Sequence, residues 1–268
     1  MALVPFPGTQ PSPYQFPSDD DDDSPGAKMS FLEHLDELRK RIVNAAIAVL
    51  VGILISFSFI SRIYSFLMAP TMRQLPPGSR LIYTEPGEAF SLYIQLSMIV
   101  GVILASPFIM YQVWMFIAPG LYSNEKRMAI PFVLFTTIGF LLGASFNHFI
   151  AFPFMMKFFA SFNTPDLAFM PKLEDVFGLY TKMLIGMGLV FQMPTIVYFL
   201  ARIKLITARF LAKNFKYAFL IIFIAAAVIT PTGDMMTQAI FAAPMVGLYL
   251  LSIAIAWIVG PKRIGDAD

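Results

Sequence analysis

Long stretches without Asp, Glu, Lys or Arg recur along the chain from position 42 onward. About 20 apolar residues cross the hydrocarbon core of a bilayer at 1.5 Å per residue, so each stretch is a candidate transmembrane helix. The pattern predicts an all-α integral membrane protein with six transmembrane helices. The stretches are Ile42–Ile60, Ala89–Asn124, Met128–Met156, Met183–Ala201, Tyr217–Gly233 and Met235–Gly260.

The fifth stretch is the shortest of the six. Its 17 residues give a helix of about 25 Å, which is less than the ~30 Å hydrocarbon core. We therefore expect local thinning of the bilayer or recruitment of a partner helix at this place. The segment Thr230–Asp234 predicts a tight turn before the sixth helix.

Prolines and loops modify this simple bundle. Loops 61–88 and 157–175 are long, contain prolines and hydrophobic residues, and are expected to pack as a cap. A proline inside a helix bends it, and several bent helices favour a concave arrangement. Such prolines are Pro107, Pro131, Pro153, Pro194 and Pro244.

Composition and charge agree with a membrane protein and give its orientation. Hydrophobic residues make up 57% of the chain and charged residues 13%, and the net charge of +2 is too small to indicate a nucleic-acid partner. With the N-terminus inside, 13 of the 19 Lys and Arg residues fall on inner segments. The positive-inside rule thus predicts both termini in the cytoplasm, with the chain in the cytoplasmic (inner) membrane.

Three regions follow from the pattern. Residues 1–28 contain the acidic run Asp19–Asp23 among Pro, Ser and Gln, which predicts a disordered acidic tail. Residues 29–262 form the six-span membrane domain, and residues 263–268 a short cytoplasmic tail.

Signatures of catalysis are missing from the sequence. The chain has no cysteine, its two histidines are far apart, and HExxH, GxSxG and GxxxxGK do not occur. A ladder of buried acids, as a proton pump needs, is also missing. We therefore predict no catalytic residue, no metal ligand and no cofactor.

The segment before the first span is amphipathic. Phe31, Leu35, Leu38 and Ile42 form one apolar stripe, which predicts a helix lying on the cytoplasmic surface. Its acids have two interpretations: Asp36 with Lys40 and Glu37 with Arg41 are favourable i,i+4 pairs, or the acids bind a cationic ligand.

Two further polar residues stand out. Glu125 lies in an otherwise basic inner loop, where it either offsets Lys126 and Arg127 or serves as a second acceptor for a cationic ligand. Gln192 lies within the fourth span and requires an interhelical hydrogen bond or a water-filled groove. The carbonyl freed by Pro194 is a possible partner for its amide.

Four stretches carry a family resemblance. They are Phe31–Ile42 (FLEHLDELRKRI), Tyr111–Arg127 (YQVWMFIAPGLYSNEKR), Gly188–Pro194 (GLVFQMP) and Val228–Gln238 (VITPTGDMMTQ). In this order, over about residues 29–262, the chain resembles the TatC family, the large subunit of the twin-arginine protein translocase.

The resemblance implies a cupped six-helix receptor for signal peptides with two consecutive arginines. Such receptors work with the single-span subunits TatA and TatB, in oligomeric complexes, to export folded proteins on the proton-motive force. It implies that Glu37 and Glu125 face the two guanidinium groups, and that Arg39 and Phe116 shape the site.

Other residues receive roles from the same resemblance. Pro70 matches a position in the outer cap, and Thr230 and Gln238, with Asp234 in the turn between them, are expected to dock a single-span partner. Two features depart from the family pattern: Gln192 stands where the family often has Glu, and the turn after Thr230 is one residue longer than usual.

A small-molecule secondary transporter is the alternative function. It would predict repeated halves and ionisable or unwound sites at the bilayer midplane. The sequence shows no repeated halves, and only Gln192 lies at depth.

Overall fold

The computed structural model describes residues 31–117, 129–164, 166–230 and 234–260. The predicted tails 1–28 and 263–268, the turn residues 231–233 and the loop with Glu125 lie outside the described residues. Helices make up most of the described chain, and the β-pairing within it is limited to isolated bridges in the loops. They are α1 (Phe31–Ser58), α2 (Ile60–Gln74), α3 (Glu88–Ile117), α4 (Ala129–Phe146), a π-helical segment (Asn147–Ala151), α5 (Phe152–Ala160), α6 (Leu173–Val190), α7 (Met193–Arg202), α8 (Ala208–Lys213), α9 (Phe215–Ile229) and α10 (Met235–Val259).

Five helical stretches in the described residues are long and apolar enough to cross a membrane, which confirms five of the six predicted spans by length and composition. The predicted fifth span is the apolar helix α9, which has 15 residues and is shorter than the other candidates. The five are Leu32–Ser58, Glu88–Ile117, Ile130–Ala160, Leu173–Arg202 and Met235–Val259.

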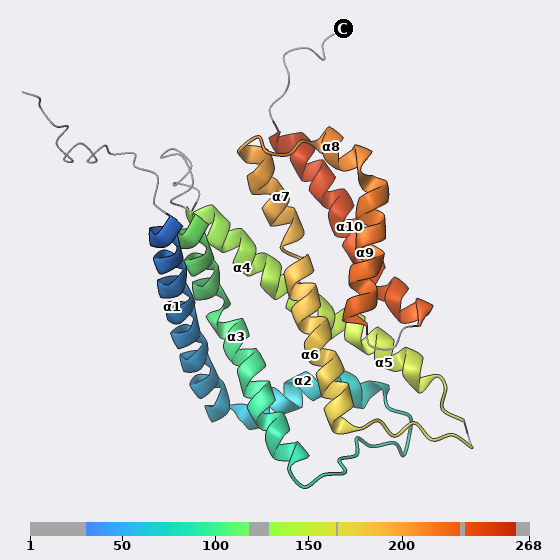
Figure 1. The fold of residues 1–268 in the computed structure, drawn as a ribbon. Coiled ribbons are helices and arrows are strands. Elements are labelled where there is room, and N and C mark those ends of the chain that lie inside the picture. The colour runs from blue at the N-terminus through green and yellow to red at the C-terminus, as the bar shows by residue number, and fades with distance from the viewer. Residues whose placement is uncertain (1–30, 118–128, 165, 231–233, 261–268) are drawn as a thin grey trace, which may run out of the picture.

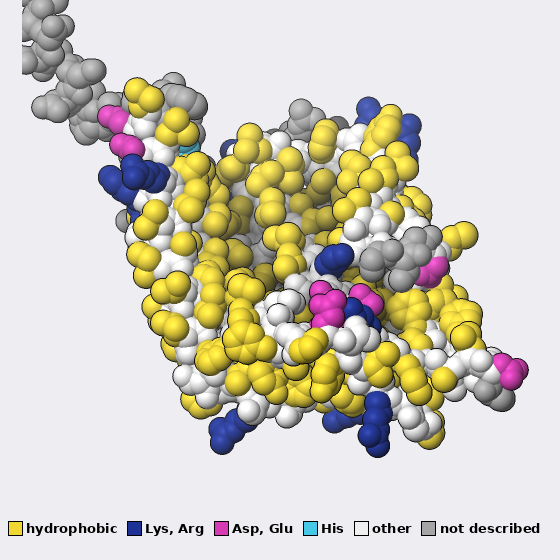
Figure 2. Space-filling view, turned by 60° about the horizontal axis from the view of Figure 1, so that its bottom comes forward, with side chains coloured by type: hydrophobic (Ala, Val, Ile, Leu, Met, Phe, Trp, Pro, Cys, Tyr) yellow, Lys and Arg dark blue, Asp and Glu magenta, His cyan; other side chains and the backbone are white. Residues whose placement is uncertain are grey.

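Figure 1 shows α1 and α3 side by side at one edge of the fold and α7 to α10 at the other edge, with α4 and α6 between them. In Figure 2 most of the visible face is hydrophobic, and the Lys and Arg side chains form small groups at its edges and near its centre, where Asp and Glu side chains lie beside them. A largely apolar surface is typical of a protein that contacts lipid.

Helix α1 corrects one prediction. The expected surface helix 31–42 does not end at position 42 but continues into the first span as one helix of 28 residues. Neither Gly nor Pro occurs between positions 31 and 51, so nothing interrupts the helix there. Leu35 and Ile42, from the predicted apolar stripe, are 45% and 58% exposed and face away from the protein.

The seam between α1 and α3 depends on two glycines. α1 packs mainly on α3, and only 11% of its spanning window is buried. A Cβ atom added to Gly52 would lie 2.5 Å from the carbonyl oxygen of Gly101, and one added to Gly101 would lie 2.7 Å from the backbone nitrogen of Ile53. The two backbones therefore approach more closely than any side chain would permit.

Two proline-containing helices are interrupted beside the buried core. The π-helical segment precedes Pro153 in α5, and the break between α6 and α7 precedes Pro194. Both interruptions agree with the prediction that prolines disturb the spans. The largest fully buried side chains include Tyr180, Phe152 and Phe177.

The two long loops pack against each other, as predicted for a cap. The backbone nitrogen of Ile82 donates to Pro171 (3.2 Å), and that of Leu173 donates to Ile82 (2.8 Å). Helix α2 forms the rest of this cap, and Pro70 is buried within it.

Candidate functional site

The start of α1 and the end of α3 bring together a small polar cluster. The Nε atom of Arg41 donates to Oε1 of Glu37 at 2.6 Å, and its Nη2 forms an ion pair with the same oxygen. The remaining nitrogen, Nη1, donates to Oε1 of Gln112 on α3 at 3.2 Å. One guanidinium group is thus held by a carboxylate of its own helix and by an amide of the neighbouring helix.

Helix geometry explains why Glu37 and Arg41 form an ion pair whereas the adjacent residues Asp36 and Lys40 do not. Glu37 and Arg41 are one turn apart on the side of α1 that faces α3, and their side chains are 18% and 22% exposed. The local pairing predicted for them is therefore confirmed. Asp36 and Lys40, both described and both exposed, form no ion pair.

Two aromatic rings continue the cluster. His34 of α1 stacks on Phe116 of α3 with ring centroids 4.4 Å apart and an interplanar angle of 19°. The sequence predicted Phe116 for the site, whereas it indicated neither His34 nor Gln112. The available signals were the position of His34 one turn before Glu37 and the polar character of Gln112 in an apolar run.

Two further predicted binding residues are Arg39 and Glu125, and the structure describes only Arg39. Arg39 is exposed on α1 and, within the described chain, forms no ion pair with Glu37. Glu125 lies outside the described residues, so its distance from Glu37 is not defined. Trp114, near the end of α3, is buried against Phe132 and Phe199.

The cluster shows how a carboxylate of this chain holds a guanidinium group of the same chain. An ionised carboxylate accepts two hydrogen bonds from one guanidinium, and such charge-assisted bonds are stronger than neutral ones. In the described part of the chain, no group of three or more His, Cys, Asp or Glu residues is arranged to hold a metal ion. The carboxylate of Glu37 is thus an acceptor whose observed partner is a cationic group.

Gln192 connects two helices. It is 7% exposed, and its Nε2 atom donates to the carbonyl of Thr136 on α4 (3.0 Å) and to that of Gly188 (3.3 Å). The interhelical hydrogen bond predicted as one alternative is therefore present. The carbonyl freed by Pro194, the other possible partner, is not the one used among the described residues. The backbone nitrogen of Gln192 bonds to Leu189, which leaves the Gly188 carbonyl for the side chain.

The residues predicted to dock a partner lie around the turn between α9 and α10. The Thr230 hydroxyl is buried and donates to the carbonyl of Ala226 at 2.8 Å. The Gln238 amide donates to the carbonyl of Phe223 at 2.9 Å, which ties α10 to α9. Asp234 caps α10 by accepting a hydrogen bond from the backbone of Thr237 at 2.7 Å.

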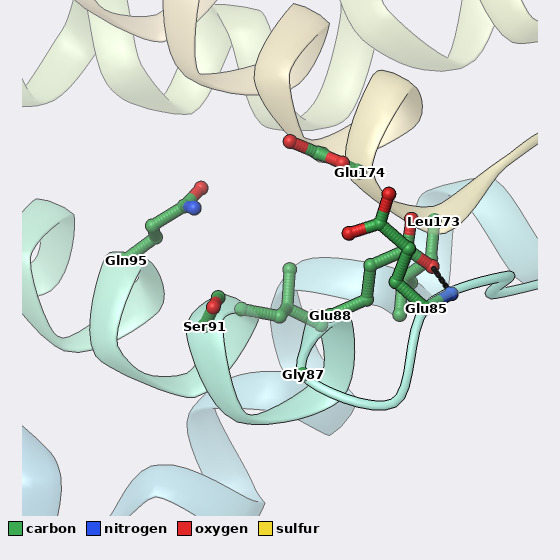
Figure 3. Close-up of a pocket in the computed structure, with 8 residues that line it drawn as sticks. Glu85, Gly87, Glu88, Ser91, Gln95, Leu173 and Glu174 are labelled. Carbon is green, nitrogen blue, oxygen red and sulfur yellow. Dashed lines mark hydrogen bonds between the residues drawn. The ribbon is translucent and has the colours of Figure 1, made fainter.

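A polar hollow lies in the cap, between the start of α3 and the start of α6 (Figure 3). Glu85, Glu88 and Glu174 line it, and Nζ of Lys172 lies 2.8 Å from Oε1 of Glu88. The hydrogen bond to Glu88 raises the pKa of Lys172. The backbone nitrogen of Thr84 also donates to Glu88, at 2.7 Å. Since these bonds join two loops, the cluster stabilises the cap.

Comparison with known proteins agrees with the fold. The sequence model of the family described as Sec-independent protein translocase protein (TatC) matches residues 33–244. TatC of Desulforapulum autotrophicum is 42% identical over 90% of this chain and 89% of its own length, and that of Koribacter versatilis is 39% identical over 88% of each.

Solved structures give the same result. A crystal structure of the twin-arginine translocase receptor TatC superposes with a TM-score of 0.73 at 38% identity, over 83% of this chain and 97% of the other. A second, of TatC in DDM, gives a TM-score of 0.75 at 37% identity, over 83% and 99%. The chain belongs to the TatC family of Sec-independent protein translocase proteins.

Proposed function

We propose that this chain is the receptor subunit of a twin-arginine translocase and binds signal peptides that carry two consecutive arginines. One observation carries the proposal: the carboxylate of Glu37 on α1 already accepts a hydrogen bond from a guanidinium group and forms an ion pair with it. The relatives' description as twin-arginine translocase receptors supports it.

The chemistry accounts for a preference for arginine over lysine. A guanidinium presents donors in a fixed planar fork that matches a carboxylate, whereas an ammonium is a point charge. Phe116, stacked on His34, provides an aromatic surface beside the carboxylate. In this proposal Glu125 is the acid for the second arginine, and Arg39 contributes from the exposed side of α1.

The proposal includes a topology. Both termini are in the cytoplasm, the chain lies in the cytoplasmic (inner) membrane, and α9 is the fifth of six spans in a cupped arrangement. This orientation puts the Glu37 cluster at the cytoplasmic face, where a signal peptide arrives, and puts the cap with Pro70 on the outer side. The excess of Lys and Arg on the predicted inner segments supports it.

Assembly is the last part of the proposal. Single-span subunits of the TatA and TatB type dock where the short helix α9 meets α10, beside Thr230, Asp234 and Gln238. The 15 residues of α9 give about 22 Å of helix, which leaves a mismatch with the bilayer that a partner helix relieves. Several copies of the chain form the receptor complex, and the proton-motive force drives export.

A binding experiment tests the receptor function. The full chain in detergent micelles is titrated with a fluorescent signal peptide containing Arg-Arg and with its Lys-Lys variant. We expect binding of the Arg-Arg peptide, weaker binding of the Lys-Lys peptide, and loss of binding in Glu37→Gln.

Asp36→Asn is the matched control, because it removes the same charge one residue away on the exposed side of α1. It should bind the peptide like the unaltered chain. Equal binding by Glu37→Gln and the unaltered chain would refute the role of Glu37. A photo-crosslinking probe at position 125 tests the second acid in the same way.

A further inference from the structure

The proposed binding carboxylate is already occupied. Arg41 directs two of its nitrogens at Oε1 of Glu37, the carboxylate to which the signal-peptide arginine would bind. The two guanidinium groups therefore compete for the same carboxylate, and one of them belongs to the receptor.

We propose that Arg41 is a resident competitor, so that binding of a signal peptide exchanges one arginine for another at Glu37. The inference rests on the proposed function, because it names how that site is regulated. The ligand-free receptor stays in a paired, closed state until a peptide guanidinium displaces Arg41.

Gln112 makes the exchange feasible. Its Oε1 lies 3.2 Å from Nη1 of Arg41, and its side chain is buried on α3. When Arg41 leaves Glu37, this amide still accepts one of its hydrogen bonds, so the displaced cation keeps a partner. Without such a replacement, leaving a partly buried charge unpaired costs free energy.

The free oxygen of Glu37 offers a first point of contact. Both contacts of Arg41 go to Oε1, and Oε2 receives no hydrogen bond from the described residues. An incoming guanidinium can bind Oε2 before Arg41 leaves Oε1. The exchange thus needs no state in which the carboxylate is unpaired.

The competition has a thermodynamic signature. Displacing Arg41 costs the same whichever peptide arrives, so removing Arg41 strengthens binding of every peptide by the same factor. The ratio of Arg-Arg to Lys-Lys affinity then stays constant. A residue that merely positions Glu37 would behave differently, because its loss would weaken the preferred peptide most.

The experiment measures the affinities of the Arg-Arg and Lys-Lys peptides for the unaltered full chain and for Arg41→Gln. Releasing charge-assisted hydrogen bonds of a partly exposed pair should tighten binding of both peptides about fivefold to tenfold. Lys40→Gln removes the same charge from the adjacent exposed position, where no ion pair exists in the described part of the chain. It corrects for the general effect of net charge and should change affinity less than twofold or so.

Arg41→Lys serves as the second variant if Arg41→Gln folds poorly. It keeps the charge and the aliphatic stem but loses the planar fork, so binding should tighten by about twofold to threefold. Unchanged or weaker binding by folded variants, or a changed ratio between the peptides, would overturn the inference alone. Absence of peptide binding to the unaltered chain would overturn the proposed function and the inference with it.

Discussion

Replacing Gly52 by alanine should separate α1 from α3. The new Cβ would lie 2.5 Å from the carbonyl oxygen of Gly101, whereas ordinary contacts begin at 3.4 Å. The backbones must therefore move apart by about 0.9 Å. Overpacking of this kind costs about 1–3 kcal/mol.

Gly247→Ala provides the reference for this measurement. Gly247 lies inside α10, and a Cβ added there meets no atom within 4 Å. Both substitutions gain the same intrinsic helix propensity of about 1 kcal/mol, so the difference between them isolates the contact with α3. We expect Gly52→Ala to be less stable than Gly247→Ala by about 1–3 kcal/mol.

The assay is reversible unfolding of the purified chain in mixed micelles, followed by circular dichroism as the SDS fraction rises. A second readout follows the seam directly. The chain has no native cysteine, so cysteines at His34 and Phe116 can be crosslinked without background. Crosslinking should be slower in the Gly52→Ala background. Equal stability of Gly52→Ala and Gly247→Ala would refute the argument that close backbone contact holds α1 in place.

Three further outcomes are expected. Gln192→Leu should lower the free energy of unfolding by about 1–2 kcal/mol in the same assay, because the bond between α4 and α6 is lost; no change would contradict that role. Asp234→Ala should cost about 1 kcal/mol through loss of the cap on α10, whereas Asp234→Asn should retain most of the stability. Lys172→Met should lower the thermal midpoint, because Glu88 loses its cation. The pKa of Lys172 in the folded chain is raised above its ordinary 10.5. The stabilisation of the fold by this ion pair is therefore complete below pH 10.5 and is lost as pH rises through the folded pKa. If the thermal midpoint of Lys172→Met fell with alkaline pH in the same way as that of the unaltered chain, this reasoning would be contradicted.

Much of the fold follows from hydropathy alone. Each of the five long apolar stretches predicted the position of a span, because a bilayer requires a minimum length of apolar helix. The boundary of α1 was predicted less well. An amphipathic stripe indicates which side of a helix is apolar but not whether that side meets protein or lipid, so the stripe with Leu35 and Ile42 was assigned to a separate surface helix.

Within the candidate site, only the contact between residues of the same helix could be predicted from the sequence. The spacing of Glu37 and Arg41 is a property of one helix, so the sequence predicts their contact. Gln112 is 71 residues away from Arg41, and their contact depends on the register between α1 and α3. That register is set by close approach at Gly52 and Gly101, for which the hydropathy pattern contains no signal.

The position of α1 at the edge of the fold (Figure 1) affects how large a ligand bound at Glu37 can be. With only 11% of its spanning window buried and α3 as its main neighbour, this helix presents Glu37 at the rim of the molecule. A ligand that binds at a rim does not have to enter a cavity or pass a gate. In the proposed function, recognition of a short terminal peptide there would therefore be independent of the bulk of the folded domain attached to it.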